Sequence, residues 1–205
     1  MGLWPSMQTQ RGYRALVPAG SSRSHYAFVS RVIGVETIHT HSHSAHTMTT
    51  AYDFQLTTVD GAPLPLANFS GKPLLLVNTA SKCGYTPQYA DLQKLWDEFT
   101  TRGLIVLGVP CNDFGGQEPE SESAIAAFCQ RAFGITFPMT AKIHVRGAHR
   151  HPLYTWLASQ GGFISRPRWN FHKYLIGRDG KMADWFSSMT RPSASRLRAA
   201  VQSLL

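Results

Sequence analysis

The stretch LLLVNTASKCGYTPQY, residues 74–89, decides the fold class of this chain. It opens on a continuous apolar run of strand length, as expected of a central strand that is covered on both faces. A polar, turn-rich piece follows, and Thr86 and Pro87 then provide an N-cap and a proline at the first helical position. The stretch therefore predicts a buried strand, a short loop that carries Cys83, and a helix.

The residues that follow extend this pattern into a strand–helix–strand unit. An amphipathic helix is indicated by four apolar residues at i, i+3, i+4 and i+7, namely Leu92, Leu95, Trp96 and Phe99. Gly103 closes this helix, and the run LIVLGV at residues 104–109 predicts a second buried strand. Two buried strands joined by a helix form a right-handed parallel crossover.

The flanking segments complete an α/β layout. Residues 54–66 predict a hairpin with an Asp60-Gly61 turn, and residues 170–176 and 181–186 predict a second hairpin. Three more helices are expected: one with the apolar stripe Ile125, Phe128, Cys129 and Ala132 that ends at Gly134, a short one at residues 152–159, and a last one marked by Leu197, Ala200, Val201 and Leu204. We predict a thioredoxin-like α/β fold, with a central mixed sheet flanked by helices and an N-terminal β-hairpin.

Residues 1–47 differ from the rest of the chain. They are rich in Ser, His and Thr, hold one acidic residue and show no sustained helical or strand period. We therefore predict a disordered N-terminal extension before a single folded domain at residues 48–205. The extension contains four closely spaced histidines, His39, His41, His43 and His46. Flexible histidine tracts usually hold no specific site, so no metal is expected.

Charge and composition narrow the class of function. The 205 residues carry a formal net charge of +8, and residues 142–205 alone carry +9. Such a basic region can attract nucleic acid, an anionic small substrate or an acidic partner, or it can be a plain solvated surface. No nucleic-acid-binding motif is recognisable, so no nucleic acid partner is expected. No run of about 18 apolar residues exists, so no membrane span is expected.

Cys83 is the first candidate for chemistry. It follows a predicted strand, at the edge where open α/β sheets bind ligands. A helix N-terminus favours a thiolate over a thiol through its free N–H groups. The alternative is an inert cysteine packed as a small hydrophobe, but the surroundings TASKCGYTP are polar. The second position of a C-x-x-C pair is occupied by Thr86, which argues against a disulfide oxidoreductase.

Four separated blocks occur in order: NTASKCGYTPQY (78–89), PCNDFGGQEP (110–119), FPM (137–139) and WNFHKYLIGRDG (169–180). Together they resemble the glutathione peroxidase family, and the resemblance runs from about Ala51 to the C-terminus. It implies a thioredoxin-fold peroxidase domain at residues 48–205. It also implies a thiol-dependent peroxidase that reduces hydrogen peroxide and organic hydroperoxides without a cofactor.

The resemblance implies four catalytic residues: Cys83 as the peroxidatic cysteine, supported by Gln117, Trp169 and Asn170. The three supporting side chains are uncharged donors that can hold a thiolate and the departing oxygen. The attack leaves a sulfenic acid, which must be reduced before it is oxidised further. One departure is Asp113, where the family usually has Gln; we expect it to alter the loop without touching these four residues.

Cys129 occupies the position of the resolving cysteine in family members that form an internal disulfide and are recycled by thioredoxin. The residues alone favour a core cysteine, because Cys129 shares an apolar stripe with Ile125 and Phe128. The resemblance implies a Cys83–Cys129 disulfide, with thioredoxin as the reductant and glutathione as the alternative. A disulfide needs Cα atoms within about 7 Å, so the helix around Cys129 is expected to unwind locally. Cys111, by contrast, is expected to be a packed side chain.

Two expectations concern the whole molecule. The segment between Pro138 and Trp169 is too short for the insertion that family tetramers use, so a monomer is expected. Three cysteines are too few for a disulfide framework, which favours reduced thiols and a cytoplasmic location. An alternative function is a peroxide sensor that relays oxidation from Cys83 to a client protein.

Overall fold

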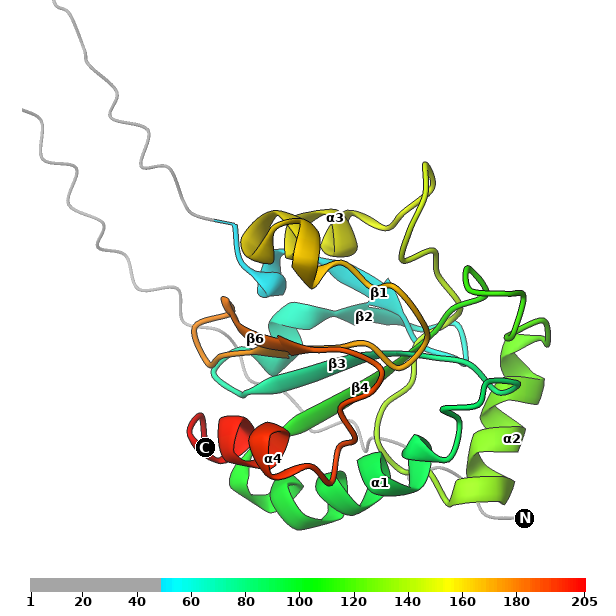
Figure 1. The fold of residues 1–205 in the computed structure, drawn as a ribbon, viewed down its shortest axis with the longest axis horizontal. Coiled ribbons are helices and arrows are strands. Elements are labelled where there is room, and N and C mark those ends of the chain that lie inside the picture. Colours follow the sequence, from blue (N-terminus) through cyan, green and yellow to red (C-terminus); the bar gives the residue numbers. More distant parts are fainter. Residues whose placement is uncertain (1–48) are drawn as a thin grey trace, which may run out of the picture. The chain divides into compact units, whose positions relative to one another are not determined.

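The computed structural model describes residues 49–205, and its centre is a four-stranded sheet (Figure 1). The strand order is β4-β3-β5-β6. The strands are β3 (Leu74–Thr79), β4 (Ile105–Pro110), β5 (Lys173–Ile176) and β6 (Met182–Phe186). β3 pairs in parallel with β4 and antiparallel with β5, and β5 pairs antiparallel with β6. The predicted mixed sheet is confirmed.

β3 is buried along its whole length because successive side chains enter two different hydrophobic clusters. Leu75 and Val77 pack with side chains of three helices, α1 (Gln88–Phe99), α2 (Glu122–Phe133) and α4 (Ser195–Gln202). Leu74 and Leu76 pack with α3 (Pro152–Gly161) and with the antiparallel hairpin of β1 (Gln55–Thr57) and β2 (Pro63–Pro65). Figure 1 shows α1 and α4 on one side of the sheet and α3 on the other.

These elements confirm the predicted thioredoxin-like layout, including the N-terminal hairpin. Four short 3-10 turns complete it: η1 (Ala51–Asp53), η2 (Leu66–Phe69), η3 (Thr100–Arg102) and η4 (Phe163–Ser165). Gly103 ends η3 with φ 104°, a left-handed conformation that glycine adopts without strain. Among the helices of residues 49–205, none has the length and apolar character needed to cross a membrane.

Two local predictions were wrong. α1 begins at Gln88, after Pro87, and the Thr86 side chain does not cap it. The Thr86 hydroxyl is already engaged by the loop around Cys83, as described below. On α2, Ala132 is exposed, and Phe133 extends the packed stripe through its ring contact with Tyr89 at 5.4 Å between centroids. The larger aromatic side chain at the neighbouring position covers the core there.

The predicted N-terminal extension lies outside the described residues. The same holds for the histidine tract, His39, His41, His43 and His46. The predictions for both therefore stay predictions.

Candidate active site

Cys83 lies in a tight turn that follows the carboxyl end of β3. Its main-chain N–H donates to Thr86 Oγ1 at 3.0 Å, and the same hydroxyl donates to the main-chain oxygen of Ala80 at 2.9 Å. The Thr86 N–H donates back to the Cys83 oxygen at 3.0 Å. One threonine therefore holds both sides of the turn, in which Cys83 is 8% exposed.

The sulfur of Cys83 accepts a hydrogen bond from the Tyr85 N–H at 3.4 Å. α1 begins five residues beyond the cysteine, so the contact comes from the turn and not from the free N–H groups of the helix. A main-chain N–H that points at sulfur stabilises a thiolate more than a thiol. The donor that contacts the sulfur therefore differs from the helix N-terminus that we predicted.

Gln117 and Asn170 are joined to each other and to this turn. The Asn170 Nδ2 donates to Gln117 Oε1 at 3.0 Å, and the Lys82 N–H donates to the main-chain oxygen of Gln117 at 3.0 Å. Asn170 is fully buried, whereas Gln117 is half-buried. Because the Gln117 oxygen is occupied by Asn170, the N–H groups of its amide remain available as donors.

Trp169 is 40% exposed and packs its ring against Phe114 at 5.9 Å between centroids. β3 fixes the backbone on either side of Asn170: Asn78 Nδ2 donates to the Trp169 oxygen at 3.2 Å, and the Phe171 N–H donates to the Asn78 oxygen at 2.6 Å. Phe171 has φ 64°, the one positive value among the described non-glycine residues. Such a conformation is rare and is often found at functional sites.

The structure thus links all four predicted residues in one region. Cys83 and Gln117 are joined through Lys82, Gln117 and Asn170 bond through their amides, and Trp169 directly precedes Asn170. The region lies at the carboxyl ends of β3 and β4, where open α/β sheets place their sites.

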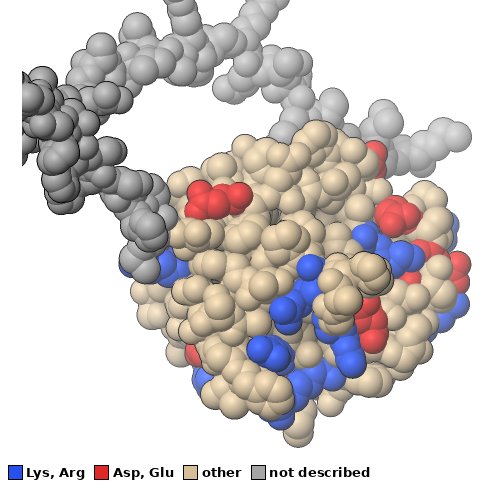
Figure 2. Space-filling model, turned by 90° about the horizontal axis from the view of Figure 1, so that it is seen from above, with Lys and Arg blue, Asp and Glu red and all other residues tan. Residues whose placement is uncertain are grey.

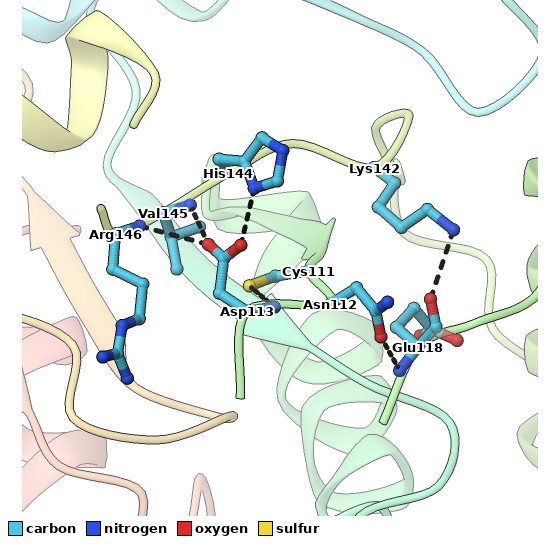
Figure 3. Close-up of polar contacts among 8 residues, drawn as sticks. All are labelled: Cys111, Asn112, Asp113, Glu118, Lys142, His144, Val145 and Arg146. Carbon is cyan, nitrogen blue, oxygen red and sulfur yellow. Dashed lines mark hydrogen bonds and ion pairs between the residues drawn. The ribbon is translucent and has the colours of Figure 1, made fainter. Parts of the chain in front are cut away.

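Glu118 is a residue that the sequence analysis missed. It is completely buried, its Oε1 accepts from the Ser81 hydroxyl, and its Oε2 has no hydrogen-bond partner. Its N–H donates to Asn112 Oδ1 at 2.8 Å, and Lys142 Nζ donates to its main-chain oxygen at 3.2 Å (Figure 3). Burial raises the pKa of Glu118, and the Ser81 contact opposes part of that rise. In the sequence, only the position of Glu118 directly after Gln117 could have indicated that it belongs to this site.

Asp113 ties the loop after β4 to a distant segment of the chain. Its Oδ1 contacts His144 Nδ1 at 2.6 Å, and its Oδ2 accepts from the N–H groups of Val145 at 2.6 Å and Arg146 at 3.1 Å (Figure 3). Burial raises the pKa of Asp113, but these contacts together outweigh it, and the pKa lies below its usual value. The unusual residue of this block therefore shapes the loop and contacts none of the four candidate catalytic side chains.

The other two cysteines are both buried. Cys111 is 0% exposed, its sulfur accepts from the Asp113 N–H at 3.4 Å, and burial raises its pKa to about 12. Cys129 lies on α2 and is 2% exposed, and burial is the main cause that raises its pKa to about 11. Cys83 and Cys129 pack in the same hydrophobic cluster, and all three cysteines are free thiols.

Comparisons with known proteins give the family. The family model "Glutathione peroxidase" matches residues 51–158. A "Glutathione peroxidase-like peroxiredoxin" of Schizosaccharomyces pombe is 48% identical over 143 residues, which span 69% of this chain and 90% of the relative. The chain belongs to the glutathione peroxidase family.

Two further relatives add to this comparison. A "Hydroperoxy fatty acid reductase" of Synechocystis is 41% identical over 170 residues, spanning 79% of this chain and 99% of that one. The crystal structure of "Trgpx in apo form" has a TM-score of 0.62 and 34% identity, and covers 77% of this chain and 96% of its own. The fold and the peroxidase class of this chain are those that its sequence blocks imply.

Proposed function

We propose that Cys83 is the peroxidatic cysteine of this thiol peroxidase and that Gln117, Trp169 and Asn170 support it. The observation that carries the proposal is the turn at Cys83, in which a main-chain N–H contacts the sulfur beside the bonded pair of Gln117 and Asn170. Uncharged donors beside a thiolate stabilise it without titrating themselves.

The proposed reaction begins when the Cys83 thiolate attacks the nearer oxygen of a hydroperoxide. The O–O bond breaks, the sulfur becomes a sulfenic acid, and the second oxygen leaves as hydroxide or alkoxide. The leaving oxygen takes a proton and departs as water or an alcohol. The Gln117 amide and the Trp169 indole donate hydrogen bonds to the charge that develops on that oxygen. Hydrogen peroxide and organic hydroperoxides both fit this step, because the chemistry involves only the O–O bond.

The second step would regenerate the thiolate through Cys129. The Cys129 sulfur attacks the sulfenic acid, water leaves, and a Cys83–Cys129 disulfide forms. A dithiol such as that of thioredoxin then reduces the disulfide and becomes oxidised itself. The relatives named peroxiredoxins support thioredoxin over glutathione as the reductant.

This step requires α2 to open. Cys129 is 2% exposed in a helix that is capped at both ends, by the Ser121 hydroxyl, which accepts from the Ala124 N–H, and by Gly134 in the left-handed conformation. Few side chains anchor α2 in the core, because only Ile125 and Cys129 among its residues are buried. A short element with few buried contacts opens locally at a low cost in free energy.

The first experiment isolates the peroxidatic step. Stopped-flow oxidation by hydrogen peroxide without reductant should be rapid in the wild type and absent in Cys83→Ser, since a hydroxyl does not form a nucleophilic anion near neutral pH. Cys111→Ser is the matched control and should react like the wild type. A Cys83→Ser rate within about tenfold of the wild type would overturn the assignment.

A second experiment tests the resolving cysteine. Mass spectrometry of protein treated with one equivalent of peroxide should identify a peptide pair crosslinked through Cys83 and Cys129. Cys129→Ser should lose turnover with thioredoxin and retain the first oxidation. Normal turnover of Cys129→Ser with thioredoxin would show that Cys129 is a core residue, and turnover with glutathione instead would reassign the reductant.

The proposal also includes an oligomeric state and a cellular location. We expect a monomer located in the cytoplasm, and three free thiols are consistent with a reducing compartment. A peroxide sensor is the less favoured function, because the relatives are named for peroxidase and reductase activities. Steady turnover with a general reductant would distinguish the enzyme from the sensor.

A further inference from the structure

Glu118 is a buried acid that the reaction described so far does not use. It is 0% exposed, and its carboxyl has no cationic partner among the ion pairs of residues 49–205. Figure 2 shows, by contrast, acidic side chains at the surface of the molecule, several of them beside Lys or Arg. A buried carboxyl without a counter-ion costs free energy, so such a group is a candidate for a role in the chemistry.

The two oxygens of this carboxyl have different surroundings. Oε1 accepts a hydrogen bond from the hydroxyl of Ser81, which stands two residues before Cys83. Oε2 is buried and has no hydrogen-bond partner. Most buried polar atoms in proteins are hydrogen-bonded, so an unpartnered carboxyl oxygen calls for an explanation. Oε2 is free to accept a proton and to hold it.

The Cys129 sulfur lies close to the same carboxyl. Burial is the main cause that raises the pKa of the Cys129 thiol to about 11, and the negative charge of Glu118 also raises it. A charge has this effect on a neighbouring group that is shielded from water. Cys129 and Cys83 also pack in one hydrophobic cluster. Glu118 is therefore next to both the turn that carries Cys83 and the sulfur of Cys129.

The main chain of Glu118 is held independently of α2. Its N–H donates to Asn112 Oδ1 at 2.8 Å, and Lys142 Nζ donates to its main-chain oxygen at 3.2 Å (Figure 3). α2 begins four residues further along the chain. Opening of α2 therefore leaves the carboxyl beside the turn of Cys83, where Cys129 has to arrive to form the disulfide.

The resolving step has to move one proton. The Cys129 thiol must lose its proton to become a nucleophile, and the hydroxyl that leaves the Cys83 sulfenic acid must gain one to depart as water. Burial raises the pKa of Glu118, which moves the group towards the range in which one carboxyl can both accept and release a proton. Because Cys129 is 2% exposed, bases in the solvent have little access to its thiol.

We propose that Glu118 is the general base and then the general acid of the resolving step. Oε2 takes the proton of the Cys129 thiol, and the Cys129 sulfur uses the freed electron pair to bond to the Cys83 sulfur. The S–O bond of the sulfenic acid breaks, and the departing hydroxide takes the proton from Glu118 and leaves as water. The carboxylate is restored, Cys129 is oxidised, and the sulfenic sulfur is reduced to the disulfide. This inference rests on the proposed function, because it adds a residue to its second step.

Other titratable groups surround this carboxyl. Lys142 and Glu120 come from the loops beside it, and Lys142 lowers its pKa whereas Glu120 raises it. Tyr89 comes from α1, and burial and then the charge of Cys129 raise its pKa well above the ordinary value, so its hydroxyl stays neutral. The variants of residue 118 described below keep Lys142, Glu120, Tyr89 and Cys129. A difference between their pH profiles and that of the wild type is therefore caused by residue 118.

The first test follows the two steps separately after one equivalent of hydrogen peroxide. Stopped-flow measurements record the oxidation of Cys83, and acid quenching with mass spectrometry records the Cys83–Cys129 disulfide. Glu118→Gln should slow disulfide formation about a hundredfold, a usual size for general acid–base catalysis, and leave the first oxidation unchanged. Glu120→Gln, an exposed acid in the same loop, is the matched control and should keep both rates. Disulfide formation at the wild-type rate in Glu118→Gln would overturn the inference.

A second comparison separates proton transfer from the contact with Ser81. Glu118→Gln keeps the length of the side chain and an oxygen for Ser81, but its amide does not take the proton. Glu118→Asp keeps the acid and loses length. Proton transfer predicts that the disulfide forms faster in Glu118→Asp than in Glu118→Gln, whereas a purely structural role predicts the reverse order. The reverse order, or an equal loss of both steps in Glu118→Gln, would refute the role in proton transfer.

The pH profile of disulfide formation does not depend on absolute rates. Between about pH 6 and 8 the rate in Glu118→Gln should rise about tenfold per pH unit, because the solvent must then generate the Cys129 thiolate. The wild type should show a shallower slope, since its carboxylate takes the proton. A wild-type slope of about tenfold per unit would by itself exclude Glu118 as the base, whatever the stability of the variants.

The same experiment distinguishes failure of this inference from failure of the proposed function. A wild type in which Cys83 is not oxidised, or in which no Cys83–Cys129 disulfide forms, would refute the proposed function and this inference with it. A wild type that completes both steps, beside a Glu118→Gln protein that completes them equally fast, would refute only the role of Glu118. The melting temperature of Glu118→Gln should not fall, since a neutral amide is less costly to bury than a carboxylate.

Discussion

Thr86 uses its hydroxyl twice, since it accepts from the Cys83 N–H and donates to the Ala80 oxygen. Thr86 is 7% exposed, so loss of its hydroxyl would leave buried polar groups without a partner. The residue that stands where a thioredoxin-like motif has its second cysteine thus takes over the positioning of the first. The presentation of Cys83 depends on this single hydroxyl.

A substitution that removes the hydroxyl tests this role. Thr86→Val should lower the free energy of unfolding by about 1–3 kcal/mol, because it leaves the Cys83 N–H without its acceptor. The rate of Cys83 oxidation by hydrogen peroxide should fall about tenfold as the turn loosens. Thr86→Ser keeps the hydroxyl and should retain most of both quantities. A Thr86→Val protein with the wild-type oxidation rate would contradict the positioning role.

Gln117 provides a second test at this scale. Gln117→Ala should slow the oxidation of Cys83 by about tenfold or more, because one preorganised donor to the leaving oxygen is lost. Gln160→Ala, an exposed glutamine on α3, is the control and should leave the second-order rate unchanged. Equal rates for the two variants would remove Gln117 from the mechanism.

Some side-chain hydrogen bonds of this site could not be predicted from the sequence. Thr86 before Pro87 fits a helix N-cap, and nothing local distinguishes that use from the bonds it makes to Ala80 and Cys83. The contact of Glu118 with Ser81 joins positions 37 residues apart, which no periodic pattern encodes. The four candidate catalytic residues could be proposed from the sequence because each stands in a recognisable block, and their roles stay predictions.

At the scale of elements, Lys173 connects β5 to the start of α1 and to the segment after β6. Its Nζ donates to Gln88 Oε1 at 2.7 Å, to the Phe171 oxygen at 2.7 Å and to the Thr190 oxygen at 2.8 Å. All three acceptors are neutral, and Lys173 is fully buried. Three acceptors match the three protons of an ammonium, while burial opposes its charge and lowers its pKa to about 7.

This lysine makes stability depend on pH. The ordinary pKa of 10.5 applies to the unfolded chain, so between pH 7 and 10.5 the unfolded state binds more protons than the folded state. The free energy of unfolding should therefore rise with pH through this window. Melting temperatures between about pH 7 and 8.5 should rise more steeply in the wild type than in Lys173→Met.

The matched control for that experiment is Lys181→Met, an exposed lysine on the same hairpin, which should keep the wild-type slope. Parallel curves for Lys173→Met and the wild type would show that the buried amine does not titrate in this window. The same three cysteines are present in all three proteins, so the titration of their thiols near pH 8.5 contributes equally to the three curves.

The elements themselves were largely predictable. The runs at residues 74–79 and 104–109 enter the sheet as buried parallel neighbours because a strand covered on both faces must be apolar throughout. Ala132 was misplaced because residues 132 and 133 both fall near the packed stripe of α2, and the packing of Phe133 on Tyr89 decides between them. The basic character of residues 142–205 was evident, but the hollow lined by Arg146, Arg150, Arg166 and Arg168 forms only when two separate segments meet.

At the scale of the whole molecule, residues 51–205 already supply two hydrophobic clusters on the two faces of the sheet. Residues 1–47 lack the apolar pattern that packing requires. Deletion of residues 1–47 should therefore change the melting temperature by less than about 2 °C and leave the oxidation rate of Cys83 unchanged. Differential scanning calorimetry would measure the shift, and a loss of several degrees would show that the extension docks on the domain.

The burial of Cys111 allows the number of thiols that peroxide oxidises in each chain to be measured. Peroxide removes electrons in pairs, and three thiols cannot all be paired within one chain. If Cys83 and Cys129 form the proposed disulfide, Cys111 should be the sulfur that stays reduced, because it is 0% exposed and burial raises its pKa to about 12. Alkylation of the denatured protein should then label all three cysteines before peroxide treatment and Cys111 alone afterwards. A side chain without a catalytic role becomes an internal standard, against which the stoichiometry of every oxidation can be calibrated in the same sample.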